Sequence, residues 1–317
     1  MFNPSQVFTK QIISKSLLLS ASLLLTFNAF AHEGVHGEQE TQQARLVSAG
    51  AGVTELVLAL EAGDELVAVD STSILPSSMT KIEKLGYHRM LSAEGILALT
   101  PTLVLGTDAM GPETTLEVLR SADVEVVKLP TANDQPQLLS NIDEIGKLLN
   151  REPQAKQLKL ELKASLNAIA AKKKQIGSAE KAPKILFMLL QADRPARVGG
   201  EGTAADIIIK LAGGNNIADF SGYKSLSQEG ILSLQPDLIL ISNRSHDQAE
   251  TSMSDAEKAA SDTAKVLKAM PLLEHTPAGK NSKIQSIKPQ ALLGGLGLSA
   301  IEAADKLATD LIEINRY

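Results

Sequence analysis

Residues 152–176 read EPQAKQLKLELKASLNAIAAKKKQI, and this stretch decides the fold. It contains no glycine, carries Pro153 near its start and is rich in strong helix formers. Its apolar residues recur at helical spacing on one face: Leu158, Leu162, Leu166 and Ile169. Gly177 follows and suits a helix end. We predict one uninterrupted helix of roughly 37 Å, at about 1.5 Å per residue, which is long enough to connect two domains.

Strand and helix signals alternate on both sides of this helix, which indicates an α/β lobe before it and another after it. In the first lobe, the expected strands are 45–49, 66–70, 103–106 and 124–129, and the expected helices are 53–61, 93–99, 112–120 and 134–149. In the second lobe, the expected strands are 185–190, 238–242 and 282–287, and the expected helices are 203–211, 255–269 and 298–314. In the first lobe, short turns between the alternating elements favour a parallel sheet.

The predicted order of domains follows from these signals. An N-terminal α/β lobe occupies 45–150, the linking helix 151–177 and a C-terminal α/β lobe 178–317. Residues 32–44 are polar and show no periodicity, so we expect a flexible leader there.

Residues 1–31 have the pattern of a secretory signal peptide. Lys10 and Lys15 precede a short apolar run, and an Ala-x-Ala cleavage signal ends at Ala31. The apolar run is shorter than a typical membrane-spanning helix. An uncleaved membrane anchor is the alternative interpretation. We expect export to the periplasm, cleavage after Ala31 and a mature protein that is not embedded in the membrane. With no cysteine near the cleavage site, a free protein is favoured over a lipoprotein.

The composition excludes several classes of function. The chain has 317 residues, a formal net charge of −6 and only 3% aromatic residues, which argues against a nucleic-acid partner. It has no cysteine, which removes disulfides, thiolate zinc sites, iron–sulfur clusters and cysteine nucleophiles.

An internal repeat indicates two similar lobes. Residues 91–105, LSAEGILALTPTLVL, return as LSQEGILSLQPDLIL at residues 226–240, and ten of the fifteen positions are identical. Glu94 and Glu229 occupy the same place in the two copies, each at the start of a short helix. A carboxylate there interacts favourably with the helix dipole, so a structural role is one interpretation.

The polar segment Gly86-Tyr87-His88-Arg89 precedes the first copy of the repeat. In α/β folds, loops at the carboxyl edge of the sheet bind ligands. A tyrosine phenolate is a hard ligand for ferric iron, as in some haem proteins, and Arg89 could stabilise its charge. Alternation along an extended loop would place Tyr87 and Arg89 on one side and His88, an alternative ligand, on the other. A solvated loop with a packing tyrosine is the competing interpretation.

Two further motifs carry weaker signals. His32-Glu33-Gly34-Val35-His36 fits the zincin pattern, but it lies in the polar leader and lacks the helix that this metal site needs. The glycines at 199–202 are followed by no Lys-Ser/Thr pair, so we expect a turn into a helix there and no phosphate loop.

The chain resembles the periplasmic haem-binding proteins of bacterial haem ABC importers, within the vitamin B12 and iron-siderophore periplasmic-binding-protein family. The resemblance covers 45–317 and rests on four segments: VSAGAGVTELVLALEAGDELVAVDSTS (47–73), GYHRMLSAEGILALTPTLVL (86–105), GGEGTAADIIIKLAGG (199–214) and FSGYKSLSQEGILSLQPDLIL (220–240). It implies two Rossmann-like α/β lobes joined by a single long rigid helix, the helical-backbone type of periplasmic binding protein.

The resemblance also implies roles for individual residues. Tyr87 would be the axial ligand of the haem iron, with Arg89 beside it, and Arg244 would contact a haem propionate. Tyr223 is the second-lobe counterpart of Tyr87 and would line the cleft. Some relatives carry a histidine where Gln191 stands here, and this difference argues against a second axial ligand or a second haem. Three methionines are expected as apolar linings: Met79, Met90 and Met110.

By this resemblance the protein is not an enzyme. It would capture haem b as a transported ligand between its lobes and deliver it to the permease of an ABC importer, whose separate ATPase subunit hydrolyses ATP. Glu94 and Glu229 would then dock on the permease. The same fold carrying an iron-siderophore or a corrinoid is the alternative, and a zinc hydrolase that uses the His32–His36 segment is a remote one.

Overall fold

The computed structural model describes residues 44–177, 182–191, 194–243 and 255–314. The predicted signal peptide, nearly all of the predicted leader and Arg244 lie outside these residues. Within the described part of the chain, no helix is both long and apolar enough to cross a membrane.

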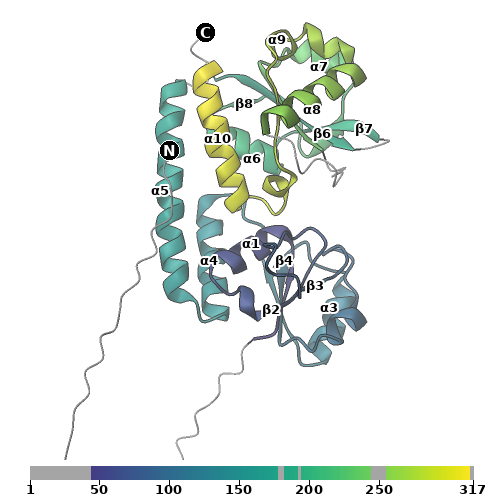
Figure 1. Ribbon diagram of the computed structural model, residues 1–317, viewed down its shortest axis with the longest axis vertical. Helices are drawn as coiled ribbons and strands as arrows, with labels where there is room; N and C mark the ends of the chain where they lie inside the picture. Colours follow the sequence, from purple (N-terminus) through teal and green to yellow (C-terminus); the bar gives the residue numbers. More distant parts are fainter. Residues whose placement is uncertain (1–43, 178–181, 192–193, 244–254, 315–317) are drawn as a thin grey trace, which may run out of the picture. The chain divides into compact units, whose positions relative to one another are not determined.

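The first sheet is entirely parallel, with the strand order β3-β2-β1-β4-β5 (Figure 1). Its strands are β1 (Leu46–Ala49), β2 (Leu66–Val69), β3 (Glu83–Lys84), β4 (Leu103–Thr107) and β5 (Glu125–Leu129). The helical segments that connect and flank them are α1 (Ala51–Ala59), η1 (Gly63–Glu65), α2 (Ala93–Leu97), α3 (Glu113–Ser121) and α4 (Gln135–Leu148). We call this sheet with its helices the first lobe. Gly50, at a φ of 123° that favours glycine, turns β1 directly into α1.

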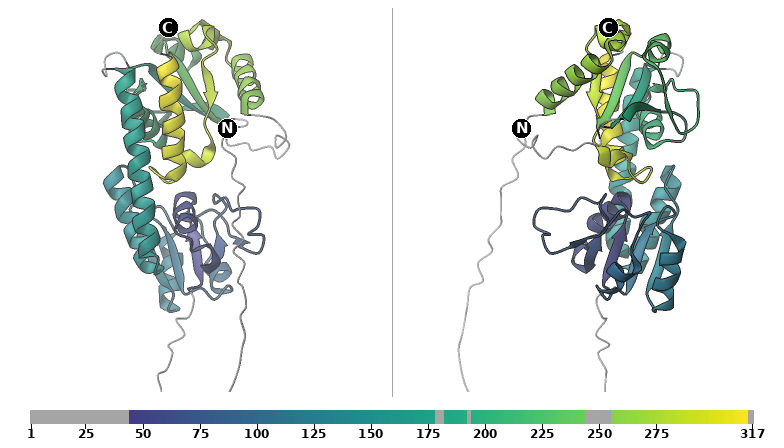
Figure 2. Two further views of the ribbon diagram at one scale, coloured as in Figure 1. Left: turned by 60° about the vertical axis from the view of Figure 1, so that its left-hand side comes forward. Right: turned by 90° about the vertical axis from the view of Figure 1, so that its right-hand side faces the viewer.

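The long helix α5 has the predicted bounds, Glu152–Ile176. The apolar residues named from the sequence are all buried: Leu158, Leu162, Leu166 and Ile169. α5 lies beside α4 of the first lobe and beside α6 (Ala204–Ala212) and α10 (Leu298–Ile314), which follow it in the chain. Its pairing with α10 is visible in Figures 1 and 2. The helix therefore packs against elements on both sides of it in the sequence.

The second sheet is mixed, with the strand order β11-β10-β6-β7-β9. Its strands are β6 (Lys184–Gln191), β7 (Arg194–Gly199), β9 (Tyr223–Ser225), β10 (Leu238–Asn243) and β11 (Ile284–Ser286), with β8 (Asn215–Asn216) pairing beside β6. Its helices, besides α6 and α10, are α7 (Gln228–Leu234), α8 (Asp255–Ala269), η4 (Pro271–His275), α9 (Pro277–Lys280) and η5 (Pro289–Leu292). We call this group the second lobe.

Alternating residues of each sheet face different parts of the core. Leu46 and Phe187 belong to a large cluster that also contains the buried face of α5, while Val47 and Met188, the next residues along, belong to two smaller clusters on the opposite faces. The α/β fold class predicted from the sequence is confirmed. The predicted domain boundaries at 45, 151 and 178 stay predictions.

Candidate functional site

Residues 85–92 form a loop at the carboxyl edge of the first sheet, because they directly follow β3. Backbone hydrogen bonds hold this loop from two neighbouring loops. The N–H of Ser71, after β2, donates to the carbonyl of Gly86 at 3.1 Å, and the N–H of Gly111, after β4, donates to the carbonyl of His88 at 3.0 Å. Leu91 donates back to Gly111 at 2.9 Å. The loop is thus fixed where ligands bind in open α/β sheets.

The three central side chains of this loop alternate in exposure as predicted, but the loop is not extended there, because the N–H of Met90 donates to the carbonyl of Tyr87 at 2.7 Å and closes a turn over His88 and Arg89. Tyr87 is 43% exposed and Arg89 is also exposed, whereas His88 is buried at 9%. Two apolar side chains of the same edge also face solvent, Ile74 at 56% and Met90 at 78%. A phenol, a guanidinium and exposed apolar side chains on the loops of one sheet edge suit a large, flat, anionic ligand. Sequence reasoning did not single out Ile74.

The buried carboxylate of Asp70 lies under this loop. Its Oδ2 is 2.9 Å from Nδ1 of His88 and accepts the hydroxyl of Thr72 at 2.7 Å; its Oδ1 accepts the hydroxyl of Ser73 at 2.6 Å and the N–H of Gly50 at 3.1 Å. Burial opposes ionisation of this group, but the hydrogen bonds from His88, Ser73 and Thr72 outweigh it and lower the pKa of Asp70 to about 2. Asp70 is therefore a carboxylate at neutral pH.

Only one of the three predicted methionine linings is well exposed. Met110 is 2% exposed in the core, so the expectation for Met110 as a pocket lining is wrong. Met79 is partly buried, with its side chain beside Gly63 and packed against the core of the first lobe. Met90 alone among them presents its side chain to solvent. The sulfur of Met110 fits against β4 because Gly106, a residue of that strand, has no side chain.

Tyr223 lies in a different environment from its sequence counterpart Tyr87. It begins β9, and its partly buried ring lies 6.5 Å edge-on from the ring of Phe187. The guanidinium of Arg197 lies 5.3 Å above its ring centroid and donates to its backbone carbonyl at 3.0 Å. A role of Tyr223 in ligand binding stays a prediction.

Gln191 and Asn243 lie at the carboxyl edge of the second sheet. Gln191 ends β6, and Asn243 ends β10, paired with Leu190 of β6. Arg244 is the next residue in the chain and lies outside the described residues. Arg194, which the sequence did not single out, pairs across the hairpin with Gln191 and is exposed. This edge therefore presents at least one cation.

Glu94 and Glu229 are both exposed in the first turn of α2 and α7. In both helices the cap is a serine: Ser92 accepts the N–H of Gly95, and Ser227 accepts the N–H of Gly230. Hydrogen bonds from its own backbone N–H and from Ser227 lower the pKa of Glu229. The serines therefore supply the side-chain caps of these two helices.

The glycine segment at 199–202 forms a turn into α6, as predicted. Thr203 caps the helix by accepting the N–H of Asp206 at 3.2 Å. Gly200 must lack a side chain, because a Cβ there would lie 1.9 Å from the carbonyl oxygen of Phe220. Among the described residues, no group of three or more histidine, aspartate or glutamate side chains could hold a metal ion.

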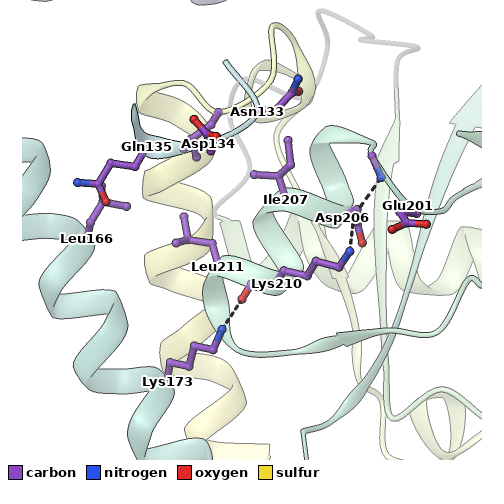
Figure 3. A pocket seen from close by; sticks show the side chains of 12 residues that line it. Asn133, Asp134, Gln135, Leu166, Lys173, Glu201, Asp206, Ile207, Lys210 and Leu211 are labelled. Carbon is purple, nitrogen blue, oxygen red and sulfur yellow. Dashed lines mark hydrogen bonds and ion pairs between the residues drawn. The ribbon is translucent and has the colours of Figure 1, made fainter. Parts of the chain in front are cut away.

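A cavity of about 690 Å³ lies away from the Tyr87 loop, beside α5 and α6 (Figure 3). Much of its polar lining is already engaged: Lys210 pairs with Asp206 at 2.9 Å, and Lys173 donates to the backbone carbonyl of Lys210 at 3.0 Å. None of the predicted ligand-binding or docking residues lines it. We therefore place the candidate site at the Tyr87 loop.

Comparison with known proteins identifies the family to which this sequence is similar. Residues 46–291 match the periplasmic binding protein family. The periplasmic heme binding protein HutB of Vibrio cholerae is 42% identical, with a TM-score of 0.74, over 85% of this chain and 99% of that one. The vitamin B12-binding protein of Yersinia pestis (strain Pestoides F) is 27% identical over 62% of this chain and 69% of its own length.

A third relative is the uncharacterized ABC transporter substrate-binding lipoprotein YvrC of Bacillus subtilis (strain 168). It is 27% identical over 62% of this chain, and the match spans 62% of that protein's length. The likeness to HutB over nearly all of its length confirms the fold predicted from the sequence, the helical-backbone type of binding protein.

Proposed function

The chain belongs to the periplasmic binding protein family, and from this premise we propose that it captures haem and delivers it to an inner-membrane ABC importer. The observation that carries the proposal is Tyr87, a phenol that is 43% exposed on a loop fixed at the ligand-binding edge of the first sheet. The 42% identity to a periplasmic heme binding protein supports haem as the ligand. The family binds solutes, and we assign no catalytic step to this chain.

In this proposal the oxygen of Tyr87 binds the ferric iron of haem as a phenolate. Arg89 is exposed two residues along the same loop and stabilises the negative charge on that oxygen. Ile74 and Met90 offer apolar contact to the porphyrin from the same edge. The phenol thus matches the iron and the apolar rim matches the flat ring of haem, while Arg89 stabilises the phenolate.

Cations of the second lobe would receive the propionates of haem. Arg244 follows β10 directly and keeps this predicted role, although it lies outside the described residues. Tyr223 is retained as a further contact from the second lobe. A second strong bond to the haem iron would need a nitrogen ligand from the second lobe. Gln191, at the end of β6, has an amide side chain, which is a poor iron ligand. We therefore propose Tyr87 as the principal axial ligand.

Delivery requires contact with the permease, and we assign this contact to Glu94 and Glu229. Both are exposed at the start of equivalent helices, and serines fill the capping positions. Exposed charges contribute little to affinity individually but orient a complex and accelerate encounter. The proposal includes export to the periplasm by the signal peptide of residues 1–31, iron acquisition as the purpose and ATP hydrolysis by a separate importer subunit.

A titration of the purified mature protein with hemin, followed by its absorption spectrum, tests the ligand. We expect saturable binding and the high-spin ferric spectrum of a phenolate-ligated haem. Tyr87→Phe keeps the ring but removes the oxygen, so it should abolish that spectrum, whereas the matched change Tyr223→Phe should retain it. An unchanged spectrum in Tyr87→Phe would overturn the ligand assignment.

Vitamin B12 is the second candidate ligand, because the Yersinia pestis relative is a vitamin B12-binding protein. The same titration with cobalamin, and with a ferric siderophore, distinguishes the candidates. Haem as ligand predicts binding of hemin alone. Tight binding of cobalamin or the siderophore without hemin binding would replace haem with that ligand.

A further inference from the structure

His88 and Asp70 form a buried pair directly beneath Tyr87. Asp70 has no exposed surface and His88 only 9%, and Nδ1 of His88 lies 2.9 Å from Oδ2 of Asp70. The pair joins loops that are 18 residues apart in sequence. Neither residue has a part in the proposed contacts to haem, so their arrangement needs a separate explanation.

The carboxylate fixes which nitrogen of His88 carries a proton. Asp70 is ionised at neutral pH, because its hydrogen bonds bring its pKa to about 2. An ionised carboxylate accepts hydrogen bonds and donates none, so Nδ1 of His88 must carry the hydrogen that lies between them. The hydrogen bond therefore holds the plane of the imidazole as well as its tautomer.

The carboxylate is itself held rigidly. It accepts the N–H of Gly50, which precedes α1, and the hydroxyls of Thr72 and Ser73. The hydroxyl of Ser73 continues to Thr54 of α1 at 2.7 Å. Asp70 thus connects His88 to the start of a helix packed in the core.

The imidazole in turn supports the phenol. The ring centroids of Tyr87 and His88 are 4.3 Å apart, and the ring planes are inclined by 56°. Tyr87 is otherwise substantially exposed, so the His88 ring is a fixed surface that limits where its side chain can swing. A loosely held ligand loses affinity because its freedom must be lost on binding.

We propose that the Asp70–His88 pair is a positioning device that presents the phenol of Tyr87 in the direction needed for the iron bond. This inference rests on the proposed function for its consequence, haem affinity, but the positioning itself is a property of the ligand-free protein. His88 is therefore a positioning residue and not a ligand of the iron.

Two variants of His88 each remove one of its two contacts, the ring contact with Tyr87 or the hydrogen bond to Asp70. His88→Asn can still donate to Asp70 but has no ring against Tyr87, and His88→Phe keeps a ring but cannot donate. Both should weaken hemin binding by about tenfold and broaden the ferric electron paramagnetic resonance signal, because the phenolate adopts several directions. The exposed His275, changed to Asn, is the matched control and should bind as the wild type does.

A second measurement needs no haem. The sequence has three tyrosines, so ring-labelled protein gives few NMR signals, and Tyr87→Phe identifies the one from Tyr87. That signal should shift in His88→Asn and in Asp70→Asn, and stay in place in His275→Asn. Circular dichroism of each variant establishes that it is folded.

The experiments distinguish a failure of the proposed function from a failure of the positioning proposal. If the wild-type protein binds no hemin, the proposed function fails, while a shifted Tyr87 signal still supports the positioning. If folded His88 variants keep wild-type hemin affinity, the wild-type paramagnetic spectrum and an unmoved Tyr87 signal, the positioning device is overturned although haem binding stands.

Discussion

Glu55 of α1 binds the start of α10 through Ser299, 244 residues further along the chain. One carboxylate oxygen accepts the backbone N–H of Ser299 at 3.3 Å, and the other accepts its hydroxyl. Leu296, just before α10, donates to the carbonyl of Ala132 after β5 at 2.6 Å. The chain that returns from the second lobe is therefore fastened to the first lobe, so α5 is not the sole connection between them.

Removing this carboxylate should destabilise the protein. Glu55 acts as the cap of α10 from another element, so Glu55→Ala should lower the free energy of unfolding by about 0.5–2 kcal/mol, the usual effect of losing a cap. Urea unfolding monitored by circular dichroism measures this. Glu313→Ala, an exposed acid on the same helix, is the control, and an equal effect of both changes would contradict the assignment.

Asp70 should make stability depend on pH in acid. Its pKa is about 2 in the folded protein against an ordinary 3.8, so the folded state favours the charged form. The resulting stabilisation, about 2 kcal/mol, is present above pH 4 and is lost as the pH falls toward 2. Asp70→Asn cannot titrate, so the difference in unfolding free energy between wild type and variant should shrink over that range. A constant difference from pH 6 to pH 2 would refute the prediction.

Arg89 should affect affinity without changing the iron ligand. Arg89→Ala removes the cation beside the proposed phenolate and should weaken hemin binding about threefold to tenfold, with the type of ferric spectrum retained. Arg120→Ala, which removes an exposed arginine paired with Glu113 in the same lobe, should leave affinity unchanged. Hemin titrations of the three proteins decide between these outcomes; a new spectrum in Arg89→Ala would mean that Arg89 determines the ligand itself.

The two repeat glutamates should matter for transport and not for binding. Glu94→Lys combined with Glu229→Lys should leave hemin affinity and melting temperature near wild type, yet abolish uptake by the importer reconstituted in liposomes. Each single change should be intermediate. Glu125→Lys with Glu313→Lys alters the charge equally at exposed positions elsewhere in the two lobes. Wild-type uptake by the Glu94/Glu229 variant would show that these acids do not dock on the permease.

The sequence predicted the long elements well, because their signals are local. The bounds of α5, α8 and α10 are those read from helix formers and apolar spacing. β7 was missed because RPARVG, with a proline and two arginines, has none of the apolar alternation of a strand. It is a strand because it pairs with β6 across the hairpin and with the more distant β9 on its other side, and its own residue pattern reveals neither pairing.

At the candidate site, too, the features that depend on local sequence were predicted, and those that depend on contacts between distant segments were not. The exposure of Tyr87 and Arg89 on either side of the buried His88 was predicted from alternation, although His88 and Arg89 lie in a turn and not in extended chain. The bond from His88 to Asp70 depends on the pairing of β2 with β3, which no local pattern reveals. The equivalence of Tyr223 to Tyr87 did not extend to their surroundings, because Tyr223 enters strand β9 whereas Tyr87 stays in a loop.

The shared core has a consequence for how the molecule unfolds. Leu105 of the first sheet, Phe187 of the second and Leu162 of α5 belong to one apolar cluster among the described residues. A cut within α5 would expose that cluster to water in both fragments, so neither half is expected to be a self-sufficient folding unit. The two lobes should accordingly lose structure together, in one cooperative transition, even though each has its own sheet.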